Sequence, residues 1–391
     1  MKNLSNSNLG LLVSFLLILI INLPKVDLFA IPGMRQGIRI DDFIVIIICI
    51  LSVNLKSGRF FLPKKISILL FYILFSSSLG VMLHPGSDLV RSFYIFRVIE
   101  YFAFAIALGN IWWYISTIRI INITIIIQFI AIMIDLFAGK ARSSGTLNGP
   151  WEVITVVGLL SFYGQYYMGR DKLKYFSIPV LLAILTQSRT AIFAVLASIS
   201  FSTKSIFKVL PIFITLIGSM TFYVIFLTGP DQFQWIKSAL NINNIELFIG
   251  FIESAWSNKG SGESIASLDS ADPSLAIRFV IWLDLISLYS ESQWLILKAL
   301  FGIGLGSKSI VVDGFYIRLI FELGLVGVFI YVKLMLELWR NTGLRPILVF
   351  LTVTCLTLDP YSSSKIAYCL GFIWASSKQL KDTKHNLMRF R

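Results

Sequence analysis

The chain has 391 residues, of which 56% are hydrophobic and only 14% are charged, and its formal net charge is +13. An average soluble domain has about 25% charged residues, so this composition excludes an ordinary soluble globular protein. The Lys and Arg residues are scattered between apolar runs and form no basic stripe with interleaved aromatic residues, which argues against nucleic acid as a partner. Membrane lipids and an anionic, lipid-linked ligand are the expected partners.

Apolar runs recur along the whole chain and predict an all-α, polytopic integral membrane protein. About twelve spans are expected. They lie near residues 9–23, 41–54, 66–83, 92–115, 119–138, 150–168, 173–187, 190–203, 207–228, 315–338, 345–359 and 364–378. Several are shorter than the ~20 residues that cross a bilayer, so the second, seventh and eighth are expected to be tilted, broken or re-entrant. The first apolar stretch lacks a small-x-small cleavage site and is expected to be a retained span.

The stretch LLAILTQSRTAIFAVLAS poses the main topological question. A single helix over 175–201 would be about 40 Å long, which exceeds a ~30 Å hydrocarbon core. Two short helices that meet at Gln187–Thr190 would instead put Arg189 at a membrane face. With a cytoplasmic N-terminus, this break places the Lys-rich loops and the basic tail on the inner side, as the positive-inside rule requires. We therefore expect Arg189 to face outward.

This topology divides the chain into four parts. The N-terminal spans occupy residues 1–228, a long outer segment 229–312, the last three spans 313–378 and a basic cytoplasmic tail 379–391. The outer segment is rich in Ser, Asn, Gly and Asp and contains the amphipathic stretch AIRFVIWLDLISLYS. We expect it to form a lid over an outward-facing cavity. No internal repeat is evident, which argues against the inverted-repeat architecture of many transporters.

Three arginines lie on the expected outer side, where topology predicts few positive charges. They are Arg142 in ARSSGTLNGPW, Arg189 in TQSRTA and Arg278 in SLAIRFVIW. A guanidinium is a rigid fork of donors that suits phosphate oxygens and does not deprotonate. Three of them converging from separate segments would suit a pyrophosphate. For each arginine singly, the alternatives are anchoring to lipid headgroups and a structural ion pair.

The segment GIGLGSKSIVVDGFY joins the outer loop to the tenth span. Its glycines Gly302, Gly304 and Gly306 predict a tight outer turn and not a nucleotide site, because no strand–helix context surrounds them. Asp313 and Tyr316 stand about one helical turn apart and would share a face. Asp313 is a candidate general base, or a group that orients a hydroxyl. Its alternative role is to cap the helix.

Two charged pairs lie inside spans, where charges are rare. Arg318 and Glu322 are spaced i,i+4 in the tenth span, and a structural ion pair is the expected explanation. Arg97 and Glu100 are spaced i,i+3 in the fourth span and are expected to form a pair near the substrate cavity. His84, in the outer loop LHPGSD, is an alternative base.

The remaining polar and thiol groups predict no metal site and no cofactor. Cys49, Cys355 and Cys369 lie in apolar runs without metal-ligand spacing and are expected to act as small hydrophobic residues. Asp41 and Asp42 open the second span from the outer side, where the helix N-terminus stabilises negative charge. A mainly structural role is expected for both.

The order of IRIDD, RSSGTLNGP, TQSRTA, a long outer loop and GIGLGS…VDGFY…ELGLVG resembles the O-antigen polymerase/ligase superfamily (Wzy-like and WaaL-like) over most of the chain. The SRTA segment and the last segment are its more specific parts. The resemblance implies a GT-C-like, metal-independent glycosyltransferase of the bacterial inner membrane, with cytoplasmic termini and a periplasmic site. Its implied substrates are glycans linked through pyrophosphate to undecaprenol, and a chain-length regulator protein is an implied partner.

Ligases of this superfamily typically carry a histidine just before the tenth span, where this chain has Asp313, and the difference favours a polymerase. The implied reaction is attack by a sugar hydroxyl of one lipid-linked unit on the anomeric carbon of another, with undecaprenyl pyrophosphate leaving. Arg142, Arg189 and Arg278 would stabilise the diphosphate, while Asp313 and Tyr316 orient or deprotonate the acceptor. Because the leaving group is already stable, positioning and electrostatics are expected to supply most of the rate. A ligase and a flippase or transporter remain as alternatives.

Overall fold

The described part of the chain is mostly helical. The computed structural model describes residues 2–29, 37–55, 64–83, 93–140, 143–168, 174–186, 188–202, 282, 294–305, 314–357 and 363–389. Helices account for 83% of these residues. They are α1 (Lys2–Asn22), α2 (Ile40–Asn54), α3 (Lys64–Leu83), α4 (Phe93–Asn110), the 3-10 helix η2 (Trp112–Tyr114), α5 (Thr117–Phe137), α6 (Pro150–Met168), α7 (Lys174–Leu185), α8 (Arg189–Ser202), α13 (Leu295–Phe301), α14 (Phe315–Trp339), α15 (Arg345–Thr357) and α16 (Ser364–Arg389).

Each predicted span except the ninth has a helix at its place in the described residues. The ninth span, near 207–228, and most of the outer segment 229–312 lie outside the described residues. One small element was not predicted: β1 (Asp27–Phe29) pairs antiparallel with β2 (Ile38–Arg39), with Asp27 opposite Arg39. Strands of two or three residues are too short to show an alternating pattern in the sequence. The two strands lie between the end of α1 and the start of α2.

The seventh and eighth predicted spans are two separate helices. α7 ends at Leu185 and α8 begins at Arg189, and the Ser188 carbonyl accepts the N–H of Ile192 to start the new helix. The 12 and 14 residues of these helices are each about 18–21 Å long, too short to cross a ~30 Å core upright. α7 and α8 pack against each other, and α8 also packs against α15.

Two of the described helices, Thr117–Phe137 and Phe315–Trp339, are long and apolar enough to cross a membrane. Shorter apolar helical stretches cover Asn8–Asn22, Ser67–Met82, Thr190–Phe201 and Arg345–Leu356. Large apolar side chains also lie on the outside of the helices, and Phe71, Met82 and Phe137 are each more than two-thirds exposed. This arrangement is consistent with a helical membrane protein, because lipid tails solvate such side chains.

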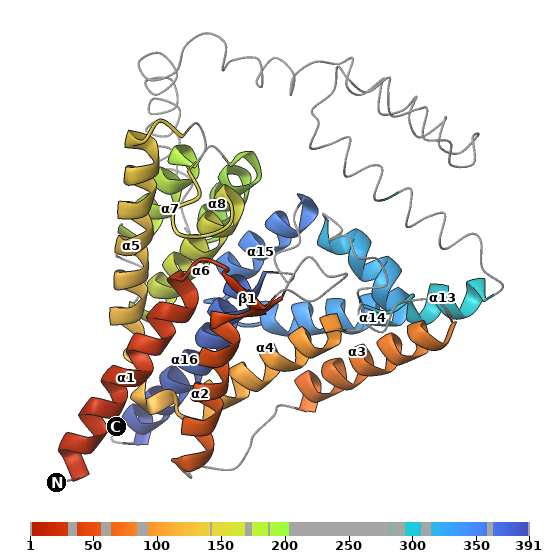
Figure 1. Ribbon diagram of the computed structural model, residues 1–391, viewed down its shortest axis with the longest axis horizontal. Helices are drawn as coiled ribbons and strands as arrows, with labels where there is room; N and C mark the ends of the chain where they lie inside the picture. Colours follow the sequence, from red (N-terminus) through yellow and green to blue (C-terminus); the bar gives the residue numbers. More distant parts are fainter. Residues whose placement is uncertain are drawn as a thin grey trace.

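The helices pack around two hydrophobic cores. The larger core joins α1, α2, α4, α5, α6, α7, α8, α15 and α16, with α16 packed against α1, α4 and α6. In Figure 1, α3, α13 and α14 lie on the right, away from α5, α6 and α7 on the left. The smaller core is formed there by Tyr72 and Ile73 of α3 with Leu319 and Leu323 of α14.

Helix α14 is broken inside its length. Gly324 has φ 65° and ψ −175°, a conformation that only glycine adopts readily, and it interrupts the helical hydrogen-bond ladder. The segment after α13 lies against this break, where the N–H groups of Ile303 and Gly304 donate to the carbonyls of Phe321 and Glu322 at 2.9 and 3.0 Å. The Tyr72 hydroxyl of α3 donates to the Leu323 carbonyl. The groups released by the break are therefore satisfied within the protein.

The backbone of residues 302–304 can pack against α14 because the part of α3 that faces it carries small residues, Ser76 and Gly80. Ser76 donates to the carbonyl of Phe301 at 2.6 Å, and a Cβ atom placed on Gly80 would collide with the carbonyl of Ile303. The segment is therefore clamped between α3 and the broken part of α14, which positions Leu305 beside both helices.

We expect Gly80→Ala to lower the thermal unfolding midpoint of the purified protein in detergent. Alanine normally favours a helix over glycine, but here its methyl group must displace a backbone carbonyl, and such overpacking costs about 1–3 kcal/mol. Gly10→Ala is the matched control, because its new Cβ would lie at an ordinary 3.4 Å from the Tyr114 carbonyl. Equal midpoints for the two variants would contradict the close packing of residues 302–304 between α3 and α14.

Candidate functional site

The structure describes only some of the predicted site residues. Side chains are described for Arg97, Glu100, Tyr316, Arg318 and Glu322. His84, Arg142, Arg278 and Asp313 lie outside the described residues, and for Arg189 only the backbone at the start of α8 is described. The convergence of the three arginines therefore stays a prediction.

Arg97 is held at the junction of α2 and α4. Its guanidinium pairs with Asp42 of α2, with Glu100 of its own helix at 2.9 Å, and with the Gly37 carbonyl at 2.7 Å. Glu100 also accepts a hydrogen bond from the Tyr368 hydroxyl of α16. The predicted Arg97–Glu100 pair is therefore present, within a network that connects three helices.

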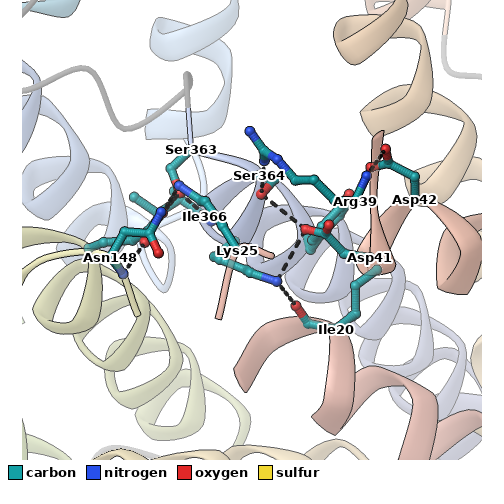
Figure 2. Close-up of polar contacts among 12 residues, drawn as sticks. Ile20, Lys25, Arg39, Asp41, Asp42, Asn148, Ser363, Ser364 and Ile366 are labelled. Carbon is teal, nitrogen blue, oxygen red and sulfur yellow. Dashed lines mark hydrogen bonds and ion pairs between the residues drawn. The ribbon is translucent and has the colours of Figure 1, made fainter. Parts of the chain in front are cut away.

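A second network surrounds Asp41, which is almost fully buried. Its carboxylate accepts hydrogen bonds from Lys365 at 3.1 Å and from Ser364 at 3.3 Å, and the Lys365 amine also donates to the Ile20 carbonyl at 2.9 Å. Arg39 donates to the Ser364 hydroxyl at 3.1 Å and forms an ion pair with Asp27. Figure 2 shows Arg39, Asp41 and Ser364 meeting where the start of α16 approaches the start of α2.

A third network connects α1, α6 and α16. The fully buried Glu152 pairs with Lys25 at 2.5 Å and accepts a hydrogen bond from the Ser363 hydroxyl. Its other carboxylate oxygen accepts the backbone N–H of Asn148 at 3.1 Å, which satisfies a donor before the first turn of α6.

We call these residues together the charged layer. Its charged members are Lys25, Arg39, Asp41, Asp42, Arg97, Glu100, Glu152 and Lys365. Four are basic and four are acidic, so the charges of these eight side chains balance. Asp27, the partner of Arg39, is 41% exposed and is not counted in the layer. They lie near the end of α1 and near the starts of α2, α4, α6 and α16, which is the end of the bundle that the sequence analysis assigns to the outer side.

Sequence reasoning missed half of this layer. Asp41 and Asp42 were recognised as helix-start residues and Arg97 and Glu100 as a pair. No role was assigned to the other four members, Lys25, Arg39, Glu152 and Lys365. A signal was present, since Glu152 and Lys365 each stand within the first three residues of an apolar helix. Such charges need partners inside the protein.

An apolar cavity of about 350 Å³ lies beside the charged layer, among α3, α4, α14 and α16. Leu69 and Ile73 of α3, Phe102 and Ala105 of α4 and Trp374 of α16 contribute to its almost wholly apolar wall. The wall also includes Val98, Tyr101, Ile106, Leu305, Phe315, Arg318, Leu319, Glu322, Leu323, Tyr331, Leu334, Met335, Ala367, Leu370 and Gly371. Tyr101 follows Glu100, and Ala367 precedes Tyr368, so two of the wall helices also carry the charged layer.

The charged side chains in this wall are Arg318 and Glu322. The Arg318 Nε–H donates to the Glu322 carboxylate at 2.6 Å, so the predicted i,i+4 pair is present. Arg318 is 14% exposed and Glu322 is 4% exposed, so the pair is largely removed from solvent. An ion pair in an otherwise apolar wall can fix the orientation of a ligand.

Tyr316 lies between α14 and α15. Its hydroxyl donates to the Thr352 carbonyl at 3.2 Å, and its ring packs edge-on against Tyr331 of the cavity wall.

Lys298 of α13 is a further buried cation, in the segment expected to lie outside the spans. Its amine is fully buried and has no hydrogen-bond partner among the described residues. Burial lowers the pKa of this amine, because a charged group loses its hydration. The folded state thus disfavours the protonated form at this position.

Neither known protein families nor curated proteins give a match to this sequence. In the described part of the chain, no group of three or more His, Cys, Asp or Glu side chains is placed to hold a metal ion. The site is therefore assigned from its own residues and their geometry.

We expect Lys365→Met to lower the unfolding midpoint strongly, because it leaves the Asp41 carboxylate buried without its cation. Removing one partner of a buried ion pair costs about 3–5 kcal/mol. The double variant Asp41→Asn, Lys365→Met removes both charges and should recover most of the midpoint. Lys140→Met is the control, since Lys140 is 57% exposed and its pair with Asp135 should contribute little. A double variant no better than Lys365→Met would contradict the pairing argument.

Proposed function

We propose that this chain is an O-antigen polymerase, or the polymerase of a related surface polysaccharide. It joins oligosaccharide repeat units that are linked through pyrophosphate to undecaprenol, on the periplasmic side of the bacterial inner membrane. In this proposal the chain has about twelve spans in a GT-C-like arrangement, with both termini in the cytoplasm. A chain-length regulator is its proposed protein partner.

One observation carries the proposal: a nearly wholly apolar cavity lies beside a layer of buried and partly buried charges at one end of the bundle. A ligand that fits both has a long apolar chain and a polar, ionic head. Lipid-linked glycans have this form, because their isoprenoid chain stays in the bilayer while the pyrophosphate and sugars face water.

The positions of the resemblance motifs add support. Arg39, Asp41 and Asp42 of the IRIDD motif belong to the charged layer. Gly304 of the GIGLG motif donates through its backbone to Glu322 of the ELGLVG motif, at the break in α14. The IRIDD motif therefore lies in the charged layer, and the GIGLG and ELGLVG motifs meet at the wall of the cavity, which includes Leu305, Glu322 and Leu323.

The chemistry follows from the ligand. An acceptor hydroxyl attacks the anomeric carbon of the donor, a new C–O bond forms, the C–O bond to pyrophosphate breaks, and undecaprenyl pyrophosphate leaves. Arg142, Arg189 and Arg278 are the proposed ligands of the departing diphosphate. Asp313 is the proposed acceptor of the hydroxyl proton, and His84 is the alternative. Tyr316 is proposed to orient the acceptor together with Asp313.

The distribution of buried charge favours an enzyme over a flippase. A flippase needs a polar path between both faces of the membrane. Among the described residues, the buried charged groups lie in α13 or within about two turns of the helix ends assigned to the outer side. They are Arg39, Asp41, Asp135, Glu152, Lys298, Glu322 and Lys365.

Deletion of the gene tests the function directly. Loss of a polymerase should leave lipid A-core capped by a single repeat unit, which gel analysis of the polysaccharide detects. Lipid-linked polymer without capped core would identify a ligase instead. Single lipid-linked units that stay on the cytoplasmic face would identify a flippase.

Arg189→Lys should abolish long-chain polysaccharide in the complemented deletion strain while the protein remains in the membrane. Lysine keeps the charge but loses the planar, multi-donor fork that binds phosphate oxygens. Arg119→Lys is the control, because Arg119 begins α5 at the opposite end of the bundle. A normal ladder of chain lengths from Arg189→Lys would remove this residue from the site.

A further inference from the structure

A polymerase of lipid-linked units must hold two such lipids at once, a donor and an acceptor, and the three predicted arginines account for one diphosphate. We propose that Arg318, oriented by Glu322, binds the phosphate group of one lipid-linked substrate, whose isoprenoid chain occupies the cavity among α3, α4, α14 and α16. This inference rests on the proposed function and adds a second anion-binding position to it.

The cavity fits a single apolar chain. Its volume of about 350 Å³ lies near the lower end of the ~300–1,000 Å³ range of ligand pockets. Small residues, Ala105 of α4 and Ala367 and Gly371 of α16, make the room where these helices approach each other. The cavity therefore holds part of a long chain, and the remainder of the chain extends into the bilayer.

Arg318 is suited to the polar end of that chain. Its Nε–H donates to Glu322 at 2.6 Å, which fixes the plane of the guanidinium while the terminal nitrogens carry the other N–H groups. The backbone of Glu322 is in turn held in place, since its carbonyl accepts the N–H of Gly304 at 3.0 Å. A guanidinium oriented by a buried carboxylate is pre-organised for bidentate contact with phosphate oxygens. Glu322 is a positioning residue in this arrangement.

The ligand has one chain and an anionic head. A bilayer phospholipid carries two acyl chains, whereas an isoprenoid pyrophosphate carries one chain. A neutral isoprenoid alcohol would fill the apolar part but offer no anion to Arg318. An isoprenoid pyrophosphate satisfies both parts, so it is the ligand to which we commit.

Native mass spectrometry of the full-length protein in detergent can measure the binding of undecaprenyl pyrophosphate and of undecaprenol. Comparing the two lipids separates the contribution of the pyrophosphate, bound by Arg318, from that of the isoprenoid chain, bound by the cavity. Arg318→Met should weaken binding of the pyrophosphate at least tenfold and leave binding of the alcohol unchanged, with Arg318→Lys between Arg318→Met and the wild type. Ala105→Phe fills the cavity and should weaken binding of both. Ile126→Phe is its control, because Ile126 is exposed on α5 and outside the cavity wall.

The positioning role of Glu322 is tested by two variants, one that keeps a hydrogen-bond acceptor for Arg318 and one that removes it. Glu322→Gln keeps an oxygen that accepts the Arg318 N–H and should retain most of the affinity for undecaprenyl pyrophosphate. Glu322→Leu removes the acceptor and should weaken pyrophosphate binding as Arg318→Met does, again without effect on the alcohol. The unfolding midpoints of all variants identify any variant that is misfolded. If Arg318→Met is misfolded, Arg318→Lys and Ala105→Phe provide the test.

The inference fails if Arg318→Met weakens both lipids equally or neither, or if phosphatidylglycerol displaces undecaprenyl pyrophosphate at equal concentration. These results are independent of polymerisation. The expected binding pattern in a protein whose deletion leaves long-chain polysaccharide intact would support the lipid site and overturn the proposed function. A confirmed polymerase without this pattern would overturn only the lipid site.

Discussion

Backbone groups and charges in an apolar interior must find their partners within the protein, and this constraint shapes the structure around the break in α14. At Gly324 the helix releases the carbonyls of Phe321, Glu322 and Leu323. The segment that follows α13 and a tyrosine of α3 supply the missing donors. The outer segment is therefore tied to α14 by the same hydrogen bonds that make the break possible.

The cavity follows from this arrangement. The first part of α14, before Gly324, carries Phe315, Arg318, Leu319 and Glu322 into the wall, and the clamped segment adds Leu305. α4 and α16 complete the wall, and their small residues Ala105, Ala367 and Gly371 leave room in it. Because α3 and α14 form their own small core beside the larger one, the cavity lies where the two cores meet.

The charged layer has a different physical basis. Its acidic and basic side chains compensate one another, so it stabilises the junction of five helices without leaving a net charge in the interior. The ion pairs and hydrogen bonds of this layer fix the orientation of its side chains. Rigid dipoles and charges close to an apolar cavity are the environment in which developing charge is stabilised without reorganisation.

The sequence by itself determined where the helices lie, because apolar runs and their interruptions are local. It located the break before Arg189 and the pairs Arg97–Glu100 and Arg318–Glu322, since residues three or four apart in a helix are neighbours by geometry. Only the tertiary structure decided that Asp41 meets Lys365, that Glu152 meets Lys25, and that Gly80 leaves space for the Ile303 carbonyl. These contacts join elements far apart in the chain. A periodic pattern within one helix carries no information about which other helix will approach it, or how closely.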